Sequence, residues 1–322
     1  MNNLKKIGLT ALAASLVSTS VFAGELTVSG SASLTAEATT GDQLNAKGAT
    51  GFSQANNIYF TGGGELDNGM TVSLSFELDD GSNSDSSATG VWDNHSVSVG
   101  NDSLGTITVH GHGGSNSASA LDTTAAGDFW DNTLGIAATE TPDAALSGNG
   151  LVVYTLPAMV DGLSAGVSYS TVGEASEASH AYGLTYAGVD GLSLSFGKGD
   201  DNSTVGTDID QTIMKASYAY GPVTVAVSNN DYDHTTSTSD QEVSSYSIGY
   251  TLTDSISVTY GSETIEKAGA TSDIDIEGVT ASYTSGGMTV GLTSIEGTNV
   301  DHSSTGTDND NEFWKVSLSF AF

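Results

Sequence analysis

The amino-acid sequence predicts an all-β protein, a transmembrane antiparallel up-and-down β-barrel of about sixteen strands. Three observations lead to this prediction: segments of strict two-residue alternation, connections that alternate between short and long, and charges that lie mainly between the alternating segments. After residue 24, no stretch keeps a period near 3.6, and none has the roughly eighteen consecutive apolar residues of a membrane helix.

The first 23 residues have the pattern of a secretory signal peptide. Lys5 and Lys6 precede the apolar run IGLTALAASLV, and Val21 and Ala23 occupy the recognition positions for cleavage before Gly24. The run has about eleven residues, whereas a membrane-spanning helix needs about twenty. We therefore expect export, followed by a single barrel domain over residues 24–322.

The charge of the mature chain excludes one class of function. Residues 1–23 contain two of the seven lysines and none of the 39 acids, and the chain has no arginine, so the mature net charge is −34. Such a chain lacks the cations that neutralise phosphates, so nucleic-acid binding is excluded, and it should attract cations. Cysteine is absent, so there are neither disulfides nor thiol chemistry.

The strands are predicted from alternation. ELTVSGSASLTAE (25–37) places Leu, Val and Ala on one face and Thr and Ser on the other, and MTVSLSFEL (70–78) does the same. A soluble β-sandwich would carry charges on its outer faces, which these segments lack. The pattern recurs in LSLSF (192–196), VTVAV (223–227), YSIGYTL (246–252), ISVTY (256–260), MTVGL (288–292) and VSLSF (316–320).

Short turns and long acidic loops are expected to alternate between these strands, as in a transmembrane barrel. Only a closed barrel leaves no unpaired backbone edge in lipid. The seven short turns are expected at 66–70, 100–105, 156–163, 187–192, 219–223, 251–255 and 284–288. The eight long loops are expected at 38–56, 80–91, 112–149, 171–179, 199–210, 230–241, 264–273 and 296–310.

Strand alternation also assigns the lumen-facing side chains. A charged side chain on the lipid face of a barrel costs about 2 to 4 kcal/mol at mid-membrane, so charged residues within strands should point inward. The expected pore-wall residues are Glu77, Asp79, His110, His112, Lys215 and Lys315.

Three hairpins give the chain a resemblance to the general bacterial porins, the sixteen-stranded trimeric channels of Gram-negative outer membranes. NIYFTGGGELDNGMTVSLSFELDDG (57–81), HSVSVGNDSLGTITVHGHG (95–113) and LVVYTLPAMVDGLSAGVSYS (151–170) resemble successive family hairpins in order and spacing. Two features depart from the family. The basic wall has no arginine, with His110 and His112 where the first would fall, and the Pro-Glu-Phe-Gly-Gly-type loop motif is missing.

The resemblance implies roles for the longest loop and for the last residue. Loop 112–149 would fold into the barrel and narrow the pore, and Phe322 would be the signal read by the barrel-assembly machinery. A homotrimer is implied in the same way. The acids that would then line the constriction are Asp122, Asp128, Asp131, Glu140 and Asp143.

An acidic constriction attracts cations and raises the barrier to anions. We therefore expect an outer-membrane channel for passive, cation-preferring diffusion of small hydrophilic solutes, with no catalytic step. A serine hydrolase on the same barrel has no Gly-x-Ser-x-Gly motif to support it. The alternative is a secreted or surface-exposed calcium-binding β-protein or adhesin without channel activity.

Acids at the loop bases offer hard oxygen ligands for calcium, directly or as a bridge to lipopolysaccharide. Plain solvated charge is the other interpretation, because none of these pairs has the spacing of an EF-hand. His110 and His112 could form a metal pair but have no third ligand nearby. The loop-base candidates for calcium are Asp79, Asp80, Asp200, Asp201, Asp308 and Asp310.

Overall fold

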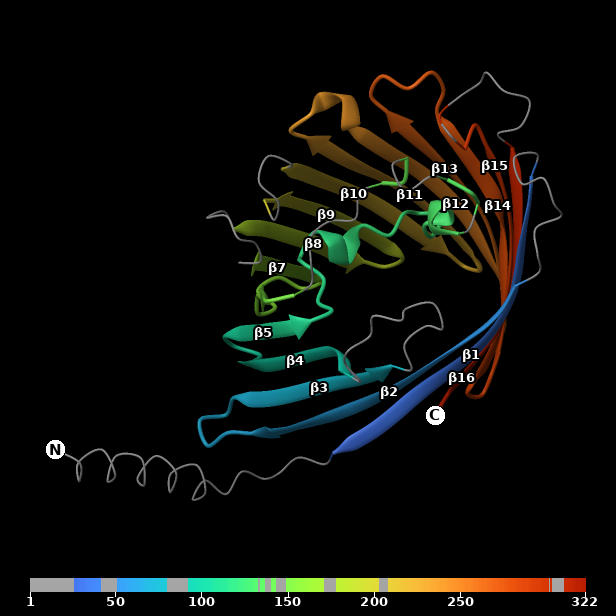
Figure 1. The fold of residues 1–322 in the computed structure, drawn as a ribbon. Coiled ribbons are helices and arrows are strands. Elements are labelled where there is room, and N and C mark those ends of the chain that lie inside the picture. Colours follow the sequence, from blue (N-terminus) through green and yellow to red (C-terminus); the bar gives the residue numbers. More distant parts are fainter. Residues whose placement is uncertain are drawn as a thin grey trace.

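The protein is a closed barrel of sixteen antiparallel strands (Figure 1). The computed structural model describes residues 26–41, 51–79, 92–132, 134–136, 140–142, 149–170, 178–202, 208–300, 302 and 310–322. Each strand pairs with its neighbours in sequence, and β1 pairs with β16, so the predicted fold class is confirmed. Within these ranges no helix is long and apolar enough to cross a membrane.

The strands differ mainly in length. They are β1 Thr27–Gly41, β2 Gly51–Glu65, β3 Thr71–Asp79, β4 Trp92–Asn101, β5 Gly105–His112, β6 Leu151–Thr155, β7 Leu163–Ser170 and β8 Ser179–Val189. The second half comprises β9 Leu192–Asp201, β10 Ile209–Tyr220, β11 Val223–His234, β12 Gln241–Thr253, β13 Ile256–Lys267, β14 Ile274–Ser285, β15 Met288–Thr298 and β16 Asn311–Ala321. Short 3-10 turns are η1 Ser119–Leu121, η2 Phe129–Asp131 and η3 Ser237–Ser239.

Cross-strand pairing gives the barrel two distinct faces. Val316 and Leu318 of β16 pair with Leu292 and Val290 of β15 on the outer face, whereas Ser317 faces the lumen. Side chains alternate between the two faces along a strand. Once one residue of a regular strand is known to face outward, the faces of all its other residues follow. The apolar alternation in the sequence is therefore the lipid-facing surface of the barrel.

The seven predicted short turns all join the strands that the sequence predicted them to join. In the first, Gly69 has φ 76° and its N–H donates to the Leu66 carbonyl oxygen at 2.8 Å, a backbone conformation that glycine adopts without strain.

The strands run further toward the long loops than alternation predicts. β11 continues to His234 and β12 begins at Gln241, although residues 230–241 were expected to form a loop. Past the apolar band the outer face no longer has to be apolar, so the hydrogen-bonded ladder continues through polar sequence.

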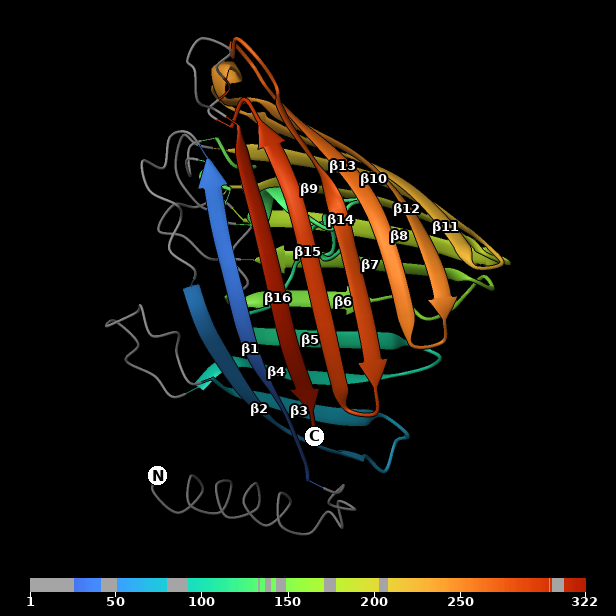
Figure 2. The same ribbon diagram turned by 90° about the vertical axis from the view of Figure 1, so that its right-hand side faces the viewer.

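The two ends of the chain close the barrel. β1 and β16 lie side by side (Figure 2), with Ser31 paired to Ala321 and the pairing continuing to Gly41 and Asn311. Beyond the strand, the Phe322 N–H donates to the Gly30 carbonyl oxygen at 3.0 Å, and the Gly30 N–H donates to the Phe322 carbonyl oxygen at 2.8 Å. The Phe322 ring also covers Gly30, where a Cβ atom would lie 2.7 Å from it.

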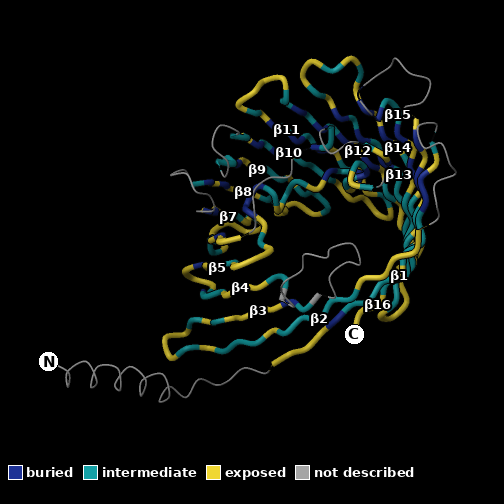
Figure 3. Tube along the Cα trace, in the orientation of Figure 1, coloured by how far each residue is buried: buried dark blue, intermediate teal, exposed yellow. Residues whose placement is uncertain are grey.

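The buried apolar side chains lie inside the barrel. Buried segments gather on the strands from β8 to β15 (Figure 3), where inward-facing Ile213, Val243 and Ile265 are fully buried. The inner face is therefore not made only of the serine and threonine side chains that the alternation places there. The physical reason is that part of the inner wall is covered by the chain itself and not by water.

Candidate functional site

The described part of the segment between β5 and β6 lies on the inner side of the barrel wall (Figure 1), with η1 beside β9 and η2 beside β13 and β14. Its first part rests on glycines. A Cβ atom on Gly183 of β8 would lie 2.1 Å from the Ser117 carbonyl oxygen, and one on Gly197 of β9 would lie 3.2 Å from the Ala118 Cα. The absence of side chains there lets the loop backbone contact the wall directly.

The next part of the loop is held by polar side chains of the wall. These side chains donate to loop carbonyl oxygens or accept from loop N–H groups. The main chain of the loop is therefore hydrogen-bonded by side chains of β10, β11 and β12. The Lys215 ammonium donates to the carbonyl oxygens of Thr123 at 2.7 Å and Thr124 at 3.3 Å, the Asn230 amide donates to the Asp122 carbonyl oxygen, and the N–H groups of Ala125 and Ala126 donate to Ser228 Oγ at 2.8 Å and Ser245 Oγ at 2.9 Å.

Glu263 of β13 is the one buried carboxylate of the wall that binds this loop among the described residues. It is 1% exposed, and it accepts hydrogen bonds from the Thr124 hydroxyl and from the Trp130 N–H, the latter at 3.1 Å. A buried carboxylate needs such donors because it has lost its water. Glu263 was not among the predicted pore-wall residues, although alternation with Ile256, Val258 and Tyr260 on the outer face places it inward.

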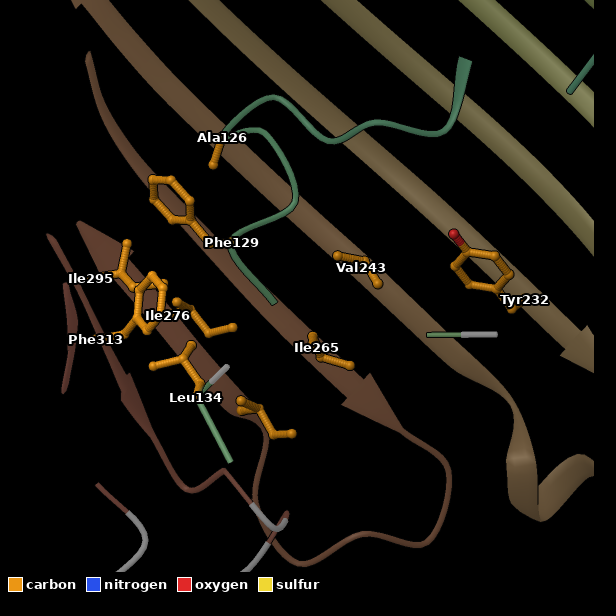
Figure 4. Packing of buried hydrophobic residues seen from close by; sticks show 10 residues of the cluster. Ala126, Phe129, Leu134, Tyr232, Val243, Ile265, Ile276, Ile295 and Phe313 are labelled. Carbon is orange, nitrogen blue, oxygen red and sulfur yellow. The ribbon is translucent and has the colours of Figure 1, made fainter. Parts of the chain in front are cut away.

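An apolar cluster holds the end of the loop. Phe129 and Leu134 of the loop pack on inward-facing Ile265, Ile276 and Phe313 (Figure 4). A signal was present in the sequence: near the long-loop end of each of these strands, the apolar side changes from the outer face to the inner face. The whole cluster is Ala126, Phe129, Leu134, Tyr232, Val243, Ile265, Ile274, Ile276, Ile295 and Phe313.

Three lysines of the inner wall bind the loop. Lys215 donates to Thr123, Lys315 donates to Asn132 Oδ1 at 3.0 Å, and the Lys267 ammonium lies 2.8 Å from Glu140 Oε2. Both lysines predicted for the pore wall therefore lie on the lumen side. Lys198 of β9 pairs with outward-facing Tyr182 and Thr212 and is on the outer face.

The predicted constriction acids have different surroundings. Asp131 is exposed, Asp128 accepts the Thr124 N–H at 2.9 Å, and Glu140 is paired with Lys267. Asp122 is partly buried between the loop and β10; this burial, together with the neighbouring Asp128 carboxylate, raises the pKa of Asp122 to about 6. Asp143 lies outside the described residues.

On the other side of the barrel, Glu77 of β3 faces the lumen but is buried. It accepts hydrogen bonds from the Asn57 amide, the Tyr59 hydroxyl at 2.7 Å and the Asn94 amide at 2.5 Å. Asp79 pairs with Asn57 along the same face of the ladder, but its side chain is outside the described part.

The prediction that both imidazoles point into the lumen is wrong for His112. A register shift makes His110 pair with Ser96, whereas His112 pairs with His95, whose ring stacks on outward-facing Phe76. The His112 Nδ1 lies 3.2 Å from an Asp93 carboxylate oxygen. The shift breaks the two-residue alternation on which the prediction relied.

The loop-base acids can be placed in part. Asp200 accepts the His180 N–H at 2.6 Å and the Asn202 amide at 2.9 Å, Asp201 ends β9, and Asp310 is exposed beside β16. Asp80 and Asp308 are outside the described residues. Within the part of the chain that the structure describes, no group of three or more His, Cys, Asp or Glu residues is arranged to hold a metal ion.

The comparisons with known proteins agree with this architecture. The sequence profile of the Gram-negative porin family matches residues 8–262, well over half of the chain. The chain belongs to the Gram-negative porin family. This porin is thus a member of a family of outer-membrane channels, which gives no support to the alternative of a secreted adhesin.

Solved porins share the barrel of this porin at low sequence identity. The anion-selective porin from Comamonas acidovorans is 17% identical, with a TM-score of 0.69 over 93% of this chain and 100% of that one. Salmonella typhi OmpF in complex with daunomycin is 15% identical, with a TM-score of 0.69 over 93% and 98%. OmpT of Vibrio cholerae lacking loop L8 is 14% identical, with a TM-score of 0.67 over 92% and 99%. A search of curated proteins gives no match.

Proposed function

We propose that this porin is a passive, cation-preferring diffusion channel for small hydrophilic solutes, narrowed by the loop between β5 and β6. One observation supports the cation preference: Lys215, Lys267 and Lys315 each bind an oxygen of the loop. The Lys267 charge is offset by the Glu140 carboxylate, and the ammonium groups of Lys215 and Lys315 are held against neutral loop oxygens, while the exposed Asp131 carboxylate has no such partner among the described contacts.

The carboxylates and lysines that line the passage determine which ions it favours. A narrow passage with carboxylates and few uncompensated cations raises the local concentration of cations and repels anions. The Comamonas porin, described as anion-selective, shares the barrel at 17% identity, so the fold leaves the sign of selectivity to the side chains. No catalytic step is assigned to the channel.

The test is a reversal-potential measurement on the mature protein in planar bilayers under a potassium chloride gradient. We expect discrete conductance steps and a reversal potential of the sign given by potassium permeation. Asp131→Asn should move the potential toward zero, and Asp67→Asn, in the turn between β2 and β3, is the matched control. A reversal potential of the chloride sign would disprove the cation preference, and an absence of conductance steps would disprove the channel.

Further parts of the function remain proposals from family membership. We expect a homotrimer in the outer membrane, assembled by the barrel-assembly machinery through Phe322 after export. A separate expectation, which rests on the carboxylates of the loop-base acids and not on the family, is calcium bound directly or as a bridge to lipopolysaccharide at Asp200, Asp201 and Asp310. Cross-linking of intact cells, with mass determination of the product, tests the trimer.

A further inference from the structure

The inner wall of the barrel carries few carboxylate and ammonium groups away from the strand ends. In the described strands, register and alternation place these groups on Glu37, Glu77, Lys215, Glu263 and Lys315. Glu77 and Glu263 are buried and accept hydrogen bonds, and Lys215 and Lys315 donate to oxygens of the loop. Glu37 of β1 is the member of this set that the loop and the wall do not hold.

The Glu37 carboxylate is available to the lumen. Its residue is partly exposed, and its side chain forms no hydrogen bond or ion pair with any residue that the structure describes. Its ladder partner on β2 is Gly51, where a Cβ atom would lie 4.0 Å from the Glu37 Cγ. Because Gly51 has no side chain, nothing from that position of β2 covers the carboxylate.

The lysine opposite Glu37 is directed elsewhere. Glu37 pairs with Lys315 of β16, and opposite charges at such cross-strand positions attract each other. The Lys315 ammonium nevertheless donates to Asn132 Oδ1 at 3.0 Å and lies 5.8 Å from the centre of the Phe313 ring. In the described part of the chain no ion pair joins Lys315 to Glu37, so the Glu37 charge is not cancelled by direct contact.

Glu37 also lies next to the strand along which the loop runs. Lys315 holds loop residue Asn132 against β16, and the exposed Asp131 directly precedes Asn132. The Asn311 amide of β16 donates to a loop carbonyl oxygen two residues further along. The inner side of β16 is therefore occupied by the loop, and the neighbouring strand β1 presents Glu37 beside it.

We propose that Glu37 is a wall residue that sets the cation preference of the passage, alongside Asp131 of the loop. A carboxylate that lines a narrow passage raises the local concentration of cations and repels anions. This role rests on the proposed function of the channel and adds a residue of the barrel wall to the acids of the loop.

The test is the reversal potential of Glu37→Gln in planar bilayers under a potassium chloride gradient. Loss of the charge should move the potential toward zero, whereas Glu37→Asp, which keeps the charge, should preserve it. The matched control is Glu312→Gln, because Glu312 is exposed on the outer face of β16. An unchanged potential in Glu37→Gln beside a cation-selective wild type would overturn the role of Glu37 alone, and a wild-type potential of the chloride sign would overturn the cation preference as well.

Ionic strength separates a charge effect from a change in loop structure. Charge interactions are screened beyond about 10 Å at 0.1 M salt and beyond about 3 Å at 1 M salt. The difference between the wild type and Glu37→Gln should therefore be large in dilute salt and shrink as the salt is raised. A difference of the same size at both concentrations would contradict an electrostatic role.

Chemical modification tests the position of Glu37 independently of selectivity. The chain has no cysteine, so the thiol of Glu37→Cys is the sole target for a thiol reagent. A water-soluble cationic methanethiosulfonate should lower the conductance of Glu37→Cys channels in steps, and it should leave the conductance of Glu312→Cys channels unchanged. Conductance of Glu37→Cys that the reagent does not alter would overturn the placement of this residue in the passage.

Discussion

Single side chains of the wall determine where the loop lies. Glu263 accepts hydrogen bonds from the Thr124 hydroxyl and the Trp130 N–H, and Lys315 donates to Asn132. Each of these two wall residues lies in a strand that pairs with the strands next to it in the barrel. Its side chain, however, bonds to the loop, which is more than a hundred residues away in sequence. Such contacts define a geometry that no stretch of the loop contains by itself.

Removal of the Glu263 carboxylate should loosen the loop. In Glu263→Ala the Thr124 hydroxyl and the Trp130 N–H lose their acceptor, at a cost of about 1 to 3 kcal/mol for each unsatisfied group. We expect larger and noisier single-channel conductance in planar bilayers. The control is Glu277→Ala on β14, because Glu277 faces outward and accepts the Tyr260 hydroxyl, with no hydrogen bond to the described part of the loop. Unchanged conductance in Glu263→Ala would contradict the holding role.

The charge of Asp122 should make selectivity depend on pH. Its pKa is raised from 3.8 to about 6, so the carboxylate is charged at pH 7 and becomes neutral as the pH falls through 6. Because the folded state then binds the proton more tightly than the unfolded chain, protonation favours the packed loop, and the channel loses one negative charge.

We therefore expect cation preference to fall between pH 7 and pH 5 in EDTA, measured as the reversal potential. Asp122→Asn should remove this step, whereas Asp131→Asn should leave it in place. A step of the same size in Asp122→Asn would show that another group titrates.

At the scale of elements, the loop and the strands share one hydrophobic core. Phe129 and Leu134 fill the inner side of β13, β14 and β16, where the strands expose Ile265, Ile276 and Phe313. Elsewhere in the barrel the lipid covers the apolar face. On this side of the lumen, the apolar inner face of the strands is therefore covered by loop side chains and not by water.

Truncation of the central aromatic side chain tests this packing. Phe129→Ala should cost about 3 to 5 kcal/mol of loop packing, the range for a buried aromatic residue. We expect faster protease cleavage within residues 113–150 in detergent, together with raised conductance. Phe76→Ala, an aromatic truncation on the outer face, is the control, and equal cleavage in both variants would disprove the role of the cluster.

At the scale of the whole molecule, stability depends on closing the barrel. The seam joins the first and last strands, and Phe322 extends it by two hydrogen bonds to Gly30 while its ring covers that glycine. An open sheet edge in lipid would leave its backbone groups unpaired, which a membrane does not tolerate.

Deletion of Phe322 should lower the amount of folded barrel in the outer membrane without changing the conductance of the channels that do form. Gly30→Val should have a similar effect, because its side chain would displace the ring. Heat-modifiable gel mobility of isolated membranes measures the folded fraction, with Gly62→Val on β2 as the matched control, because a Cβ atom there would lie 3.7 Å from its nearest neighbour, the Leu26 side chain. A changed conductance in the folded fraction would show that the seam influences the pore.

The sequence by itself determined the barrel. Two-residue alternation and alternating turn lengths identify strands, and the lipid requires an apolar outer face, so periodicity alone predicts the strand pairs and all seven short turns. The same alternation places Lys215 and Lys315 inward. The strands, the turns and the faces of these two lysines depend only on residues close in sequence and on the lipid that surrounds the whole barrel.

The tertiary structure decided the interior. Glu263, the apolar cluster around Phe129 and the pairing of Glu140 with Lys267 join residues that are more than a hundred positions apart, and the strand pattern gives no information about which loop atom meets which wall atom. The bulge that moves His112 to the outer face is likewise a local departure from alternation. The outside of the barrel meets one solvent, whereas its inside meets the chain itself, and only the folded molecule determines those contacts.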